Sequence, residues 1–386
     1  MPLQDVALVG IYATEQSRAL PHRTSLELAQ EAVFGAIADA GLKPSDVDGV
    51  AAEWPGAGGR PGEGSLWARA LGGSVRWIAD SLLDTSGVRG VLKAAAAINA
   101  GLCDVAVVGG GMAGMFGPGA TVSAGVEPGE FTDVWGAYVV PLFALVAAEH
   151  MHRFGTTPEQ LASVSATIRN NGHTNPEAIM FGRGPYTVDD VLASPMVASP
   201  LHRLDVCLSG EGGAAVVLTS MARARDLPHI PVSVLGGSME AIGGPYFTPP
   251  SYSAVGRLGA AAAERAFAIA DRSRDDVDVL SLYDPNSFEV IRQLEVLGYC
   301  PEGEGGRYVT SESIGIGGPR PLNPDGGCLS YAWNGTQQMT LKVVECVRQI
   351  RGTAVHQIQG VETALAANAG SAAGHYELAI FGKGPR

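Results

Sequence analysis

A polar turn that leads into an alanine-rich segment holds the first residues whose type and position could serve chemistry. Asp84, Thr85 and Ser86 come directly before Gly87, where the sequence predicts the start of a helix followed by a strand at 104–111. A helix N-terminus carries a partial positive charge, so a cysteine there would have a lowered pKa and act as a nucleophile. This turn contains no cysteine. Its polar side chains could cap the helix, or Asp84 could orient another side chain or a water molecule.

Side chains that can exchange protons or donate hydrogen bonds occur in three later stretches. Tyr283 directly follows an apolar run, Tyr331 and Trp333 lie in a glycine-rich turn, and His375 lies in the last glycine-rich loop. A phenol has an ordinary pKa of about 10, so it can act as a base near neutral pH only when its surroundings stabilise the phenolate. Each residue also has a structural interpretation: the aromatic residues could belong to the core or line a pocket, and His375 could be a hydrogen-bonded structural histidine.

Alternating helices and strands must position these groups. The sequence predicts a strand at 5–10, a helix with one apolar stripe at 25–41, a strand at 46–51, and helices near 65–71, 143–154 and 157–171. Strands that alternate with helices of this length are typical of an α/β fold with a mainly parallel sheet covered on both faces. The fold class predicted from the sequence is therefore α/β.

A weak internal repeat divides the chain. Residues 32–48 and 264–280 share the order helix, acidic turn and strand, and the turn before Gly87 has a counterpart in the later glycine-rich turn. Two such halves, placed at 1–225 and 226–386, predict a pseudo-twofold core whose turns face one site. Within the first half, residues 112–204 differ in texture and predict an inserted loop or lid region.

Composition excludes several classes of protein. A net charge of −13 and a pI of about 5.1 argue against nucleic acid as a partner, and 46% hydrophobic with 17% charged residues is typical of a well-packed enzyme. The longest apolar run, 137–148, is too short to span a bilayer, so we expect a cytoplasmic protein without membrane contact. Five widely spaced cysteines without a CxxC motif predict reduced thiols and neither a disulfide framework nor a metal site.

Three blocks, in order along the chain, resemble one protein family. They lie at 186–197, 204–218 and 297–303, and they are similar to the sterol-carrier-protein-X or lipid-transfer-protein type of thiolase. The resemblance implies a thiolase fold, with two βαβαβαββ halves in a five-layered αβαβα core and an inserted loop domain. It also implies a homodimer and a coenzyme-A ester as substrate, although a fold does not by itself determine the reaction.

The four positions that carry thiolase chemistry all differ from the family pattern. By the resemblance, Asp84 takes the place of the nucleophilic cysteine, and Tyr283, followed closely by Asn286, takes the place of the second motif. Trp333 takes the place of the general-base histidine, and Asn368 that of the second cysteine. Aspartate does not readily form a productive thioester and tryptophan cannot accept a proton, so Claisen condensation and thiolysis are predicted to be absent.

One branch of this family lacks the same catalytic residues, and this chain resembles it: the steroid side-chain-cleaving aldolases of actinobacterial cholesterol breakdown. The resemblance implies retro-aldol cleavage of a 17-hydroxy-C20-carboxyl-CoA steroid to a 17-ketosteroid and propionyl-CoA. That branch carries two active-site tyrosines, to which Tyr283 and Tyr331 correspond, one as base and the other as acid in an order left open. The supporting or pocket residues would be Asp84, Asn286, Trp333, Asn368 and His375.

Two other functions stay open at this point. The chain could be a non-catalytic acyl-CoA-binding or sterol-binding scaffold, or another carbon–carbon lyase or condensing enzyme that acts on acyl-CoA esters. Tyrosines rather than aliphatic residues at the acid and base positions favour an enzyme. The resemblance implies no cofactor, because coenzyme A is part of the substrate. It also implies a heterotetramer, in which a homodimer binds a separate OB-fold, zinc-ribbon acyl-CoA-associated protein on each side.

Overall fold

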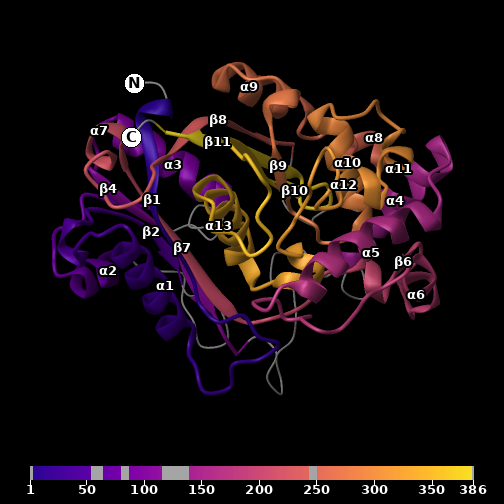
Figure 1. Ribbon diagram of the computed structural model, residues 1–386, viewed down its shortest axis with the longest axis horizontal. Coiled ribbons are helices and arrows are strands. Elements are labelled where there is room, and N and C mark those ends of the chain that lie inside the picture. The colour runs from indigo at the N-terminus through magenta and orange to yellow at the C-terminus, as the bar shows by residue number, and fades with distance from the viewer. Residues whose placement is uncertain (1–2, 54–63, 80–86, 115–138, 243–249, 385–386) are drawn as a thin grey trace.

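The computed structural model describes residues 3–53, 64–79, 87–114, 139–242 and 250–384 (Figure 1). Its main sheet has nine strands: β1 (Val6–Ala13), β2 (Gly49–Glu53), β3 (Trp77–Ile78), β4 (Val105–Met112), β7 (Gly212–Ser220), β8 (Val232–Ala241), β9 (Val279–Leu282), β10 (Thr363–Gly370) and β11 (His375–Lys383). They lie in the order β3-β2-β4-β7-β1-β8-β11-β10-β9. The pairing of β1 with β8 is short, with Ala7 opposite Ser233 and Leu8 opposite Val232, and it joins the strands of the two halves.

The sheet is mixed, so the expectation of a mainly parallel sheet is wrong. β2 runs parallel to β3 and β4, and β9 runs parallel to β10, whereas the other neighbouring strands are antiparallel. The connection between β10 and β11 shows why. Only residues 371–374 join them, and a connection this short cannot cross over to a parallel strand.

The strands form two groups that meet at β1 and β8: the first is β3-β2-β4-β7-β1 and the second is β8-β11-β10-β9. Helices form three layers that alternate with these two groups, and α13 lies at the centre of the view in Figure 1. The long helices of these layers are α1 (Ser25–Asp39), α2 (Gly64–Leu71), α3 (Gly87–Asn99), α9 (Ala260–Ala270), α10 (Ser287–Leu297) and α13 (Gln338–Arg351). α1 and α2 pack on the outer face of the first group of strands, and α9 and α10 on the outer face of the second. α3 and α13 fill the space between the inner faces of both groups. This confirms the predicted five-layered αβαβα core.

The inserted region packs against the second half. It contains α4 (Val139–Phe154), α5 (Pro158–Thr174), α6 (Val188–Ala193) and a hairpin of β5 (Met196–Ala198) and β6 (Leu201–His202). α5 begins at a capping box, in which Thr157 and Gln160 exchange side-chain and backbone hydrogen bonds. α4 and α5 share one hydrophobic core with α10. Shorter helices complete the fold: α7 (Met221–Ala224), α8 (Tyr252–Val255), α11 (Gly305–Tyr308) and α12 (Ser311–Ile314).

The two stretches that resemble each other in sequence form the same elements. In the first, α1 leads through a 3-10 turn at Pro44–Asp46 to β2, and in the second, α9 leads through a 3-10 turn at Arg274–Asp276 to β9. The exact division between 225 and 226 stays a prediction, because the sheet continues from β1 to β8. Within the described ranges, no helix is both long and apolar enough to cross a membrane.

Candidate active site

The N-termini of the two central helices meet, as the predicted symmetry requires. Gly87 begins α3 with a φ of +42°, and its N–H donates to Thr340 Oγ1 of α13 at 3.0 Å. A Cβ atom at Gly87 would lie 2.2 Å from the Cβ atom of Met339, so this contact requires glycine. Asp84 lies outside the described residues, and its place in the site stays a prediction.

Three neighbouring strands, β9, β10 and β11, supply a row of polar side chains near the N-termini of α3 and α13. Tyr283 follows β9 and donates its backbone N–H to the Ala367 carbonyl at 2.9 Å, next to Asn368, and Asn368 lies opposite Glu377 of β11. Side chains alternate between the two faces of a strand. Ala379, two residues beyond Glu377, packs against the central helices. Tyr283, Asn368 and Glu377 therefore face the central helices from neighbouring strands.

Glu377 is a buried carboxylate that connects three groups. It accepts a hydrogen bond from Asn368 Nδ2 at 2.8 Å and forms an ion pair with Arg89 of α3. His375 Nδ1 lies 3.0 Å from Glu377 Oε1, at ion-pair distance but outside hydrogen-bond geometry. Burial acts to raise the pKa of Glu377, but His375 and Arg89 outweigh it and hold the pKa below its ordinary value. The carboxylate is therefore ionised at neutral pH.

Two members of this group were predicted from the sequence, and two were not. Asn368 and His375 were predicted, and the structure brings them together on one carboxylate. Glu377 could have been found, because it lies two residues after His375 in a strand and so shares its face. Arg89 could not, because its ion pair joins residues 288 positions apart in the chain.

Tyr283 lies where the strand ends and the helix N-termini converge. It is 7% exposed and packs with Cys328, Met339 and Trp333. Gln293 Nε2 donates to the Tyr283 carbonyl at 2.6 Å, which fixes the backbone from the side of α10. The predicted site therefore contains a phenol in a mostly apolar environment, on the face that also carries Asn368.

Trp333 packs against the cluster that contains Tyr283, and it places an indole where the family carries the general-base histidine. Its carbonyl accepts the N–H of Gly210 at 2.8 Å. The indole Nε1 is buried and has no acceptor among the described residues. Because an indole N–H can donate but not accept, Trp333 could donate a hydrogen bond to a substrate oxygen but could not act as a base.

Tyr331 packs in a different cluster from Tyr283, and the pairing of the two tyrosines in one site stays a prediction. Its hydroxyl donates to Glu177 Oε2 at 3.4 Å. Burial raises the pKa of Tyr331, with Arg348 opposing and Glu177 adding to the effect. Tyr331 and Tyr283 lie in different clusters because of the local backbone. Tyr331 ends a π-helical turn, after which the chain becomes extended and brings Trp333 against the cluster of Tyr283.

A buried ion pair holds the glycine-rich turn next to Tyr283. Asp284 lies 2.9 Å from Lys342 Nζ of α13, and both side chains are nearly inaccessible to solvent. Asp284 also accepts the backbone N–H groups of Cys328 at 2.9 Å and Leu329 at 3.1 Å. A buried carboxylate with a cation and two N–H donors is well satisfied, so this arrangement fixes the turn. No motif in the sequence marks Asp284 or Lys342.

Asn286 and Cys328 have scaffold contacts. Asn286 is the N-cap of α10, and its Oδ1 accepts the N–H of Glu289 at 3.0 Å. A supporting role for Asn286 in the reaction stays a prediction. Cys328 contacts Tyr283 but is 1% exposed. Burial raises the pKa of its thiol well above the ordinary value, with Asp284 adding to the effect, so a nucleophilic thiolate is disfavoured.

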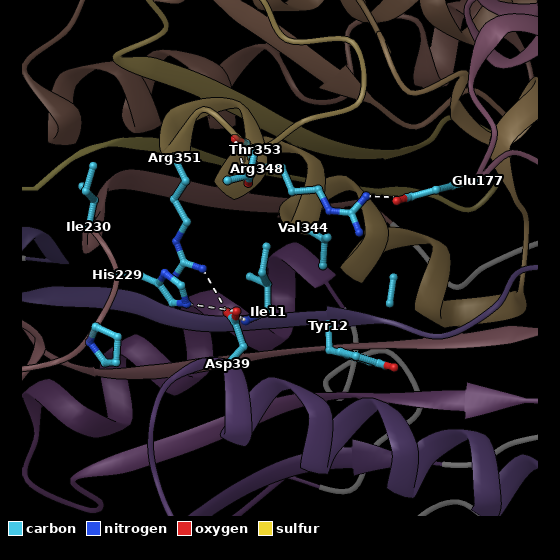
Figure 2. Close-up of a pocket in the computed structure, with 12 residues that line it drawn as sticks. Ile11, Tyr12, Asp39, Glu177, His229, Ile230, Val344, Arg348, Arg351 and Thr353 are labelled. Atoms are coloured by element: carbon cyan, nitrogen blue, oxygen red, sulfur yellow. Dashed lines mark hydrogen bonds and ion pairs between the residues drawn. The ribbon is translucent and has the colours of Figure 1, made fainter.

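A pocket of about 410 Å³ lies at the other end of α13 (Figure 2). Figure 2 shows Asp39 paired with both His229 and Arg351. Asp39 lies 3.1 Å from His229 Nε2 and 3.0 Å from the Arg351 guanidinium. Glu177 pairs there with Arg348 at 2.6 Å. The Tyr331 hydroxyl therefore bonds to a wall of this pocket, whereas the row of polar side chains on β9 to β11 lines none of it.

Comparisons with known proteins agree with this arrangement. Residues 254–383 match a family model described as thiolase C-terminal domain-like. A steroid side-chain-cleaving aldolase from Thermomonospora curvata is 32% identical over 377 residues, which cover 91% of each chain. A 17-hydroxy-3-oxo-4-pregnene-20-carboxyl-CoA lyase from Mycobacterium tuberculosis is 32% identical over 383 residues, 93% of this chain and 95% of that protein.

Solved structures support the same conclusion. The Ltp2-ChsH2(DUF35) aldolase matches with a TM-score of 0.86 and 29% identity, over 100% of this chain and 99% of that chain. Human mitochondrial 3-ketoacyl-CoA thiolase shares the fold, with a TM-score of 0.68 and 15% identity over the whole of both chains. Identity of 32% over nine-tenths of two relatives shows the family. This chain therefore belongs to the thiolase family, in the branch that contains the steroid side-chain-cleaving aldolases.

Proposed function

We propose that this chain is a carbon–carbon lyase that cleaves a 17-hydroxy-C20-carboxyl-CoA steroid by a retro-aldol reaction. Two relatives with 32% identity are named for side-chain cleavage and for a lyase acting on such a CoA ester. One observation of the structure carries the proposal. Tyr283 lies in the cluster against which Trp333 packs, and its backbone N–H bonds to the residue before Asn368, while Trp333 and Asn368 take positions where a thiolase needs histidine and cysteine.

The reaction requires proton transfers and one bond cleavage. A base takes the proton of the C17 hydroxyl, and the bond between C17 and C20 breaks as the carbonyl forms. The electron pair of that bond passes to the thioester as an enolate, which is then protonated at C20. The products, a 17-ketosteroid and propionyl-CoA, contain all the atoms of the substrate. No nucleophile, oxidant or water molecule is consumed.

Tyr283 is the proposed proton carrier. As a phenolate it takes the hydroxyl proton, and it returns the same proton to C20, so that the proton count closes. Lowering the pKa of a phenol by two units corresponds to about 2.7 kcal/mol of preferential stabilisation of the phenolate. The N-termini of α3 and α13, which meet at Gly87 and Met339, supply part of this stabilisation because their macrodipoles favour negative charge.

Trp333 is the proposed donor to the thioester oxygen. Negative charge develops on that oxygen as the enolate forms, and a fixed donor in a dry site stabilises it more than water does. The indole N–H is buried beside Tyr283, and it has no acceptor within the part of the chain that the structure describes. Coenzyme A takes part as a portion of the substrate, and the proposed reaction needs no further cofactor.

We also propose a homodimer that binds a separate OB-fold, zinc-ribbon protein on each side. The support is the similarity over the full chain to the Ltp2-ChsH2(DUF35) aldolase, whose name gives two components. Coexpression of this chain with such a protein tests the assembly. Copurification at equal stoichiometry supports it, and full lyase activity of the isolated chain contradicts the need for the second protein. A cytoplasmic location stays a prediction.

The function is tested by incubating the chain, with and without the second protein, with a 17-hydroxy steroid C20-carboxyl-CoA ester. We expect equal amounts of 17-ketosteroid and propionyl-CoA, formed at least about a hundredfold more slowly by Tyr283→Phe. Tight binding of the ester without products would instead support a non-catalytic scaffold. Thioester exchange between an acyl-CoA and free coenzyme A would show that thiolase chemistry persists and would contradict the proposal.

A further inference from the structure

We propose that Glu377 is a positioning residue for the retro-aldol step, which holds the Asn368 amide and the His375 ring on the face that carries Tyr283. This inference rests on the proposed function. Glu377 itself has no exposed side-chain surface and acts through its neighbours. Those neighbours come from three elements: Arg89 from α3, Asn368 from β10 and His375 from β11.

Stability alone does not account for a charge at this position. Charged side chains are rarely fully buried, and a buried ion pair can often be replaced by apolar residues without loss of stability. The following positions on the same face of β11 are apolar, since Ala379 and Phe381 pack against the central helices, whereas the preceding position is His375. Glu377 therefore lies where the apolar part of this face ends and the polar part begins.

The carboxylate determines which way the Asn368 amide points. A primary amide has a donor side and an acceptor side, and a carboxylate can only accept. The hydrogen bond of 2.8 Å from Asn368 Nδ2 to Glu377 Oε2 directs the NH₂ group toward β11. The amide oxygen is thereby directed away from Glu377, where it can accept a hydrogen bond from the Tyr283 phenol or the substrate hydroxyl.

Arg89 keeps Glu377 in the form that this role needs. A protonated Glu377 could donate as well as accept, and it would no longer fix the amide. Arg89 ion-pairs with Glu377, and its side chain is 19% exposed, so the guanidinium can remain partly hydrated if the carboxylate is removed. The ion pair crosses from the central layer to β11, and it couples the start of α3 to the row of polar side chains.

The test uses Glu377→Gln, which keeps the size of the side chain and removes its charge. We expect kcat to fall at least tenfold while KM stays within threefold, because the amide and ring lose their orientation but the substrate pocket does not change. The double variant Arg89→Gln/Glu377→Gln removes both charges, and we expect its kcat to stay low. Recovery of kcat in the double variant would show that Glu377 only balances Arg89, and would overturn the proposal.

A second buried carboxylate provides a matched control. Glu295 of α10 lies 3.0 Å from His150 Nε2 in the outer helix layer, so it forms the same kind of buried pair away from the site. Glu295→Gln should lower Tm by a similar amount and leave kcat within twofold. If Glu377→Gln also leaves kcat within twofold, Glu377 has no positioning role.

A spectroscopic readout separates this proposal from the proposed function. With ¹⁵N-labelled histidine, the ring signals of His375 can be assigned by their absence in His375→Gln. We expect them to move in Glu377→Gln and to stay in place in Glu295→Gln. If the unmodified protein shows no lyase activity, the proposed function fails, and these signals still decide whether Glu377 holds the ring. Unchanged signals in Glu377→Gln contradict the proposal whatever the activity.

Discussion

The two tyrosines give the sharpest prediction, because the family resemblance and the packing of the structure lead to different expectations for Tyr331. From the sequence, Tyr283→Phe and Tyr331→Phe should each abolish most of the activity. From the structure, only Tyr283 belongs to the row of polar side chains on β9 to β11, whereas the Tyr331 hydroxyl contacts Glu177 at the wall of the pocket shown in Figure 2. Both substitutions remove one oxygen atom and keep the ring, so packing is conserved and the comparison isolates the hydroxyl.

The expected magnitudes follow from the contacts. Proton transfer by a positioned side chain contributes roughly 10²- to 10⁴-fold, so Tyr283→Phe should raise the barrier by about 3 to 5 kcal/mol. Tyr331→Phe removes a long contact of 3.4 Å, while Arg348 keeps its 2.6 Å ion pair with the same carboxylate. One such hydrogen bond contributes about 1 kcal/mol to stability, and we expect turnover to change by less than about threefold.

The assay is the rate of 17-ketosteroid formation, measured with thermal unfolding of each variant. Tyr283→Phe should lose at least two orders of magnitude in kcat with Tm nearly unchanged. An equally large loss in Tyr331→Phe, without unfolding, would refute the assignment from geometry and favour the pair of tyrosines. Near-normal activity of Tyr283→Phe would refute the proposed mechanism, because the proton carrier would then be another group.

Three further predictions concern the buried groups around this site. Burial and the Asp325 charge raise the pKa of Glu345 to about 8, so the folded protein holds a proton that the unfolded chain releases near pH 4.5. Tm should therefore fall between pH 5 and 8. Glu345→Gln should flatten that fall when thermal unfolding is measured as a function of pH. Lys342→Met leaves Asp284 buried without its cation and should cost about 3 to 5 kcal/mol in denaturant unfolding, and a loss below about 1 kcal/mol would contradict the buried pair. Cys328, buried with a raised pKa, should resist iodoacetamide in the folded protein and react after unfolding, as mass spectrometry would show.

Much of the fold could be predicted from the sequence, because its signals are local or repeated. The helix predicted near 157–171 is α5, which begins at the capping box of Thr157, and the repeated order of helix, acidic turn and strand appears in both halves. The meeting of the two helix N-termini also followed from that repeat, and Gly87 provides the close contact. The direction of the strands did not follow, because periodicity reports which face is buried but not how strands are connected.

The site was harder to predict because its contacts join distant parts of the chain. Arg89 meets Glu377 across the central layer, and Lys342 reaches Asp284 from α13. Neither pair lies in a motif, and each consists of residue types that are common on protein surfaces. Of these four residues, only Glu377 could have been found by strand alternation, since it shares a face with His375.

The separate placement of Tyr331 and Tyr283 has a physical explanation. Tyr331 and Trp333 are two residues apart, and a motif match between relatives cannot distinguish them by chemistry alone. The π-helical turn at Gly327–Tyr331, held by the N–H bonds to Asp284, decides which one faces Tyr283. The indole of Trp333, rather than the phenol of Tyr331, packs against the cluster that contains Tyr283, and a catalytic role of Tyr331 stays a prediction that Tyr331→Phe tests. A single phenol that takes the hydroxyl proton and returns it to C20 still closes the reaction, and the indole N–H can stabilise the enolate between those two steps.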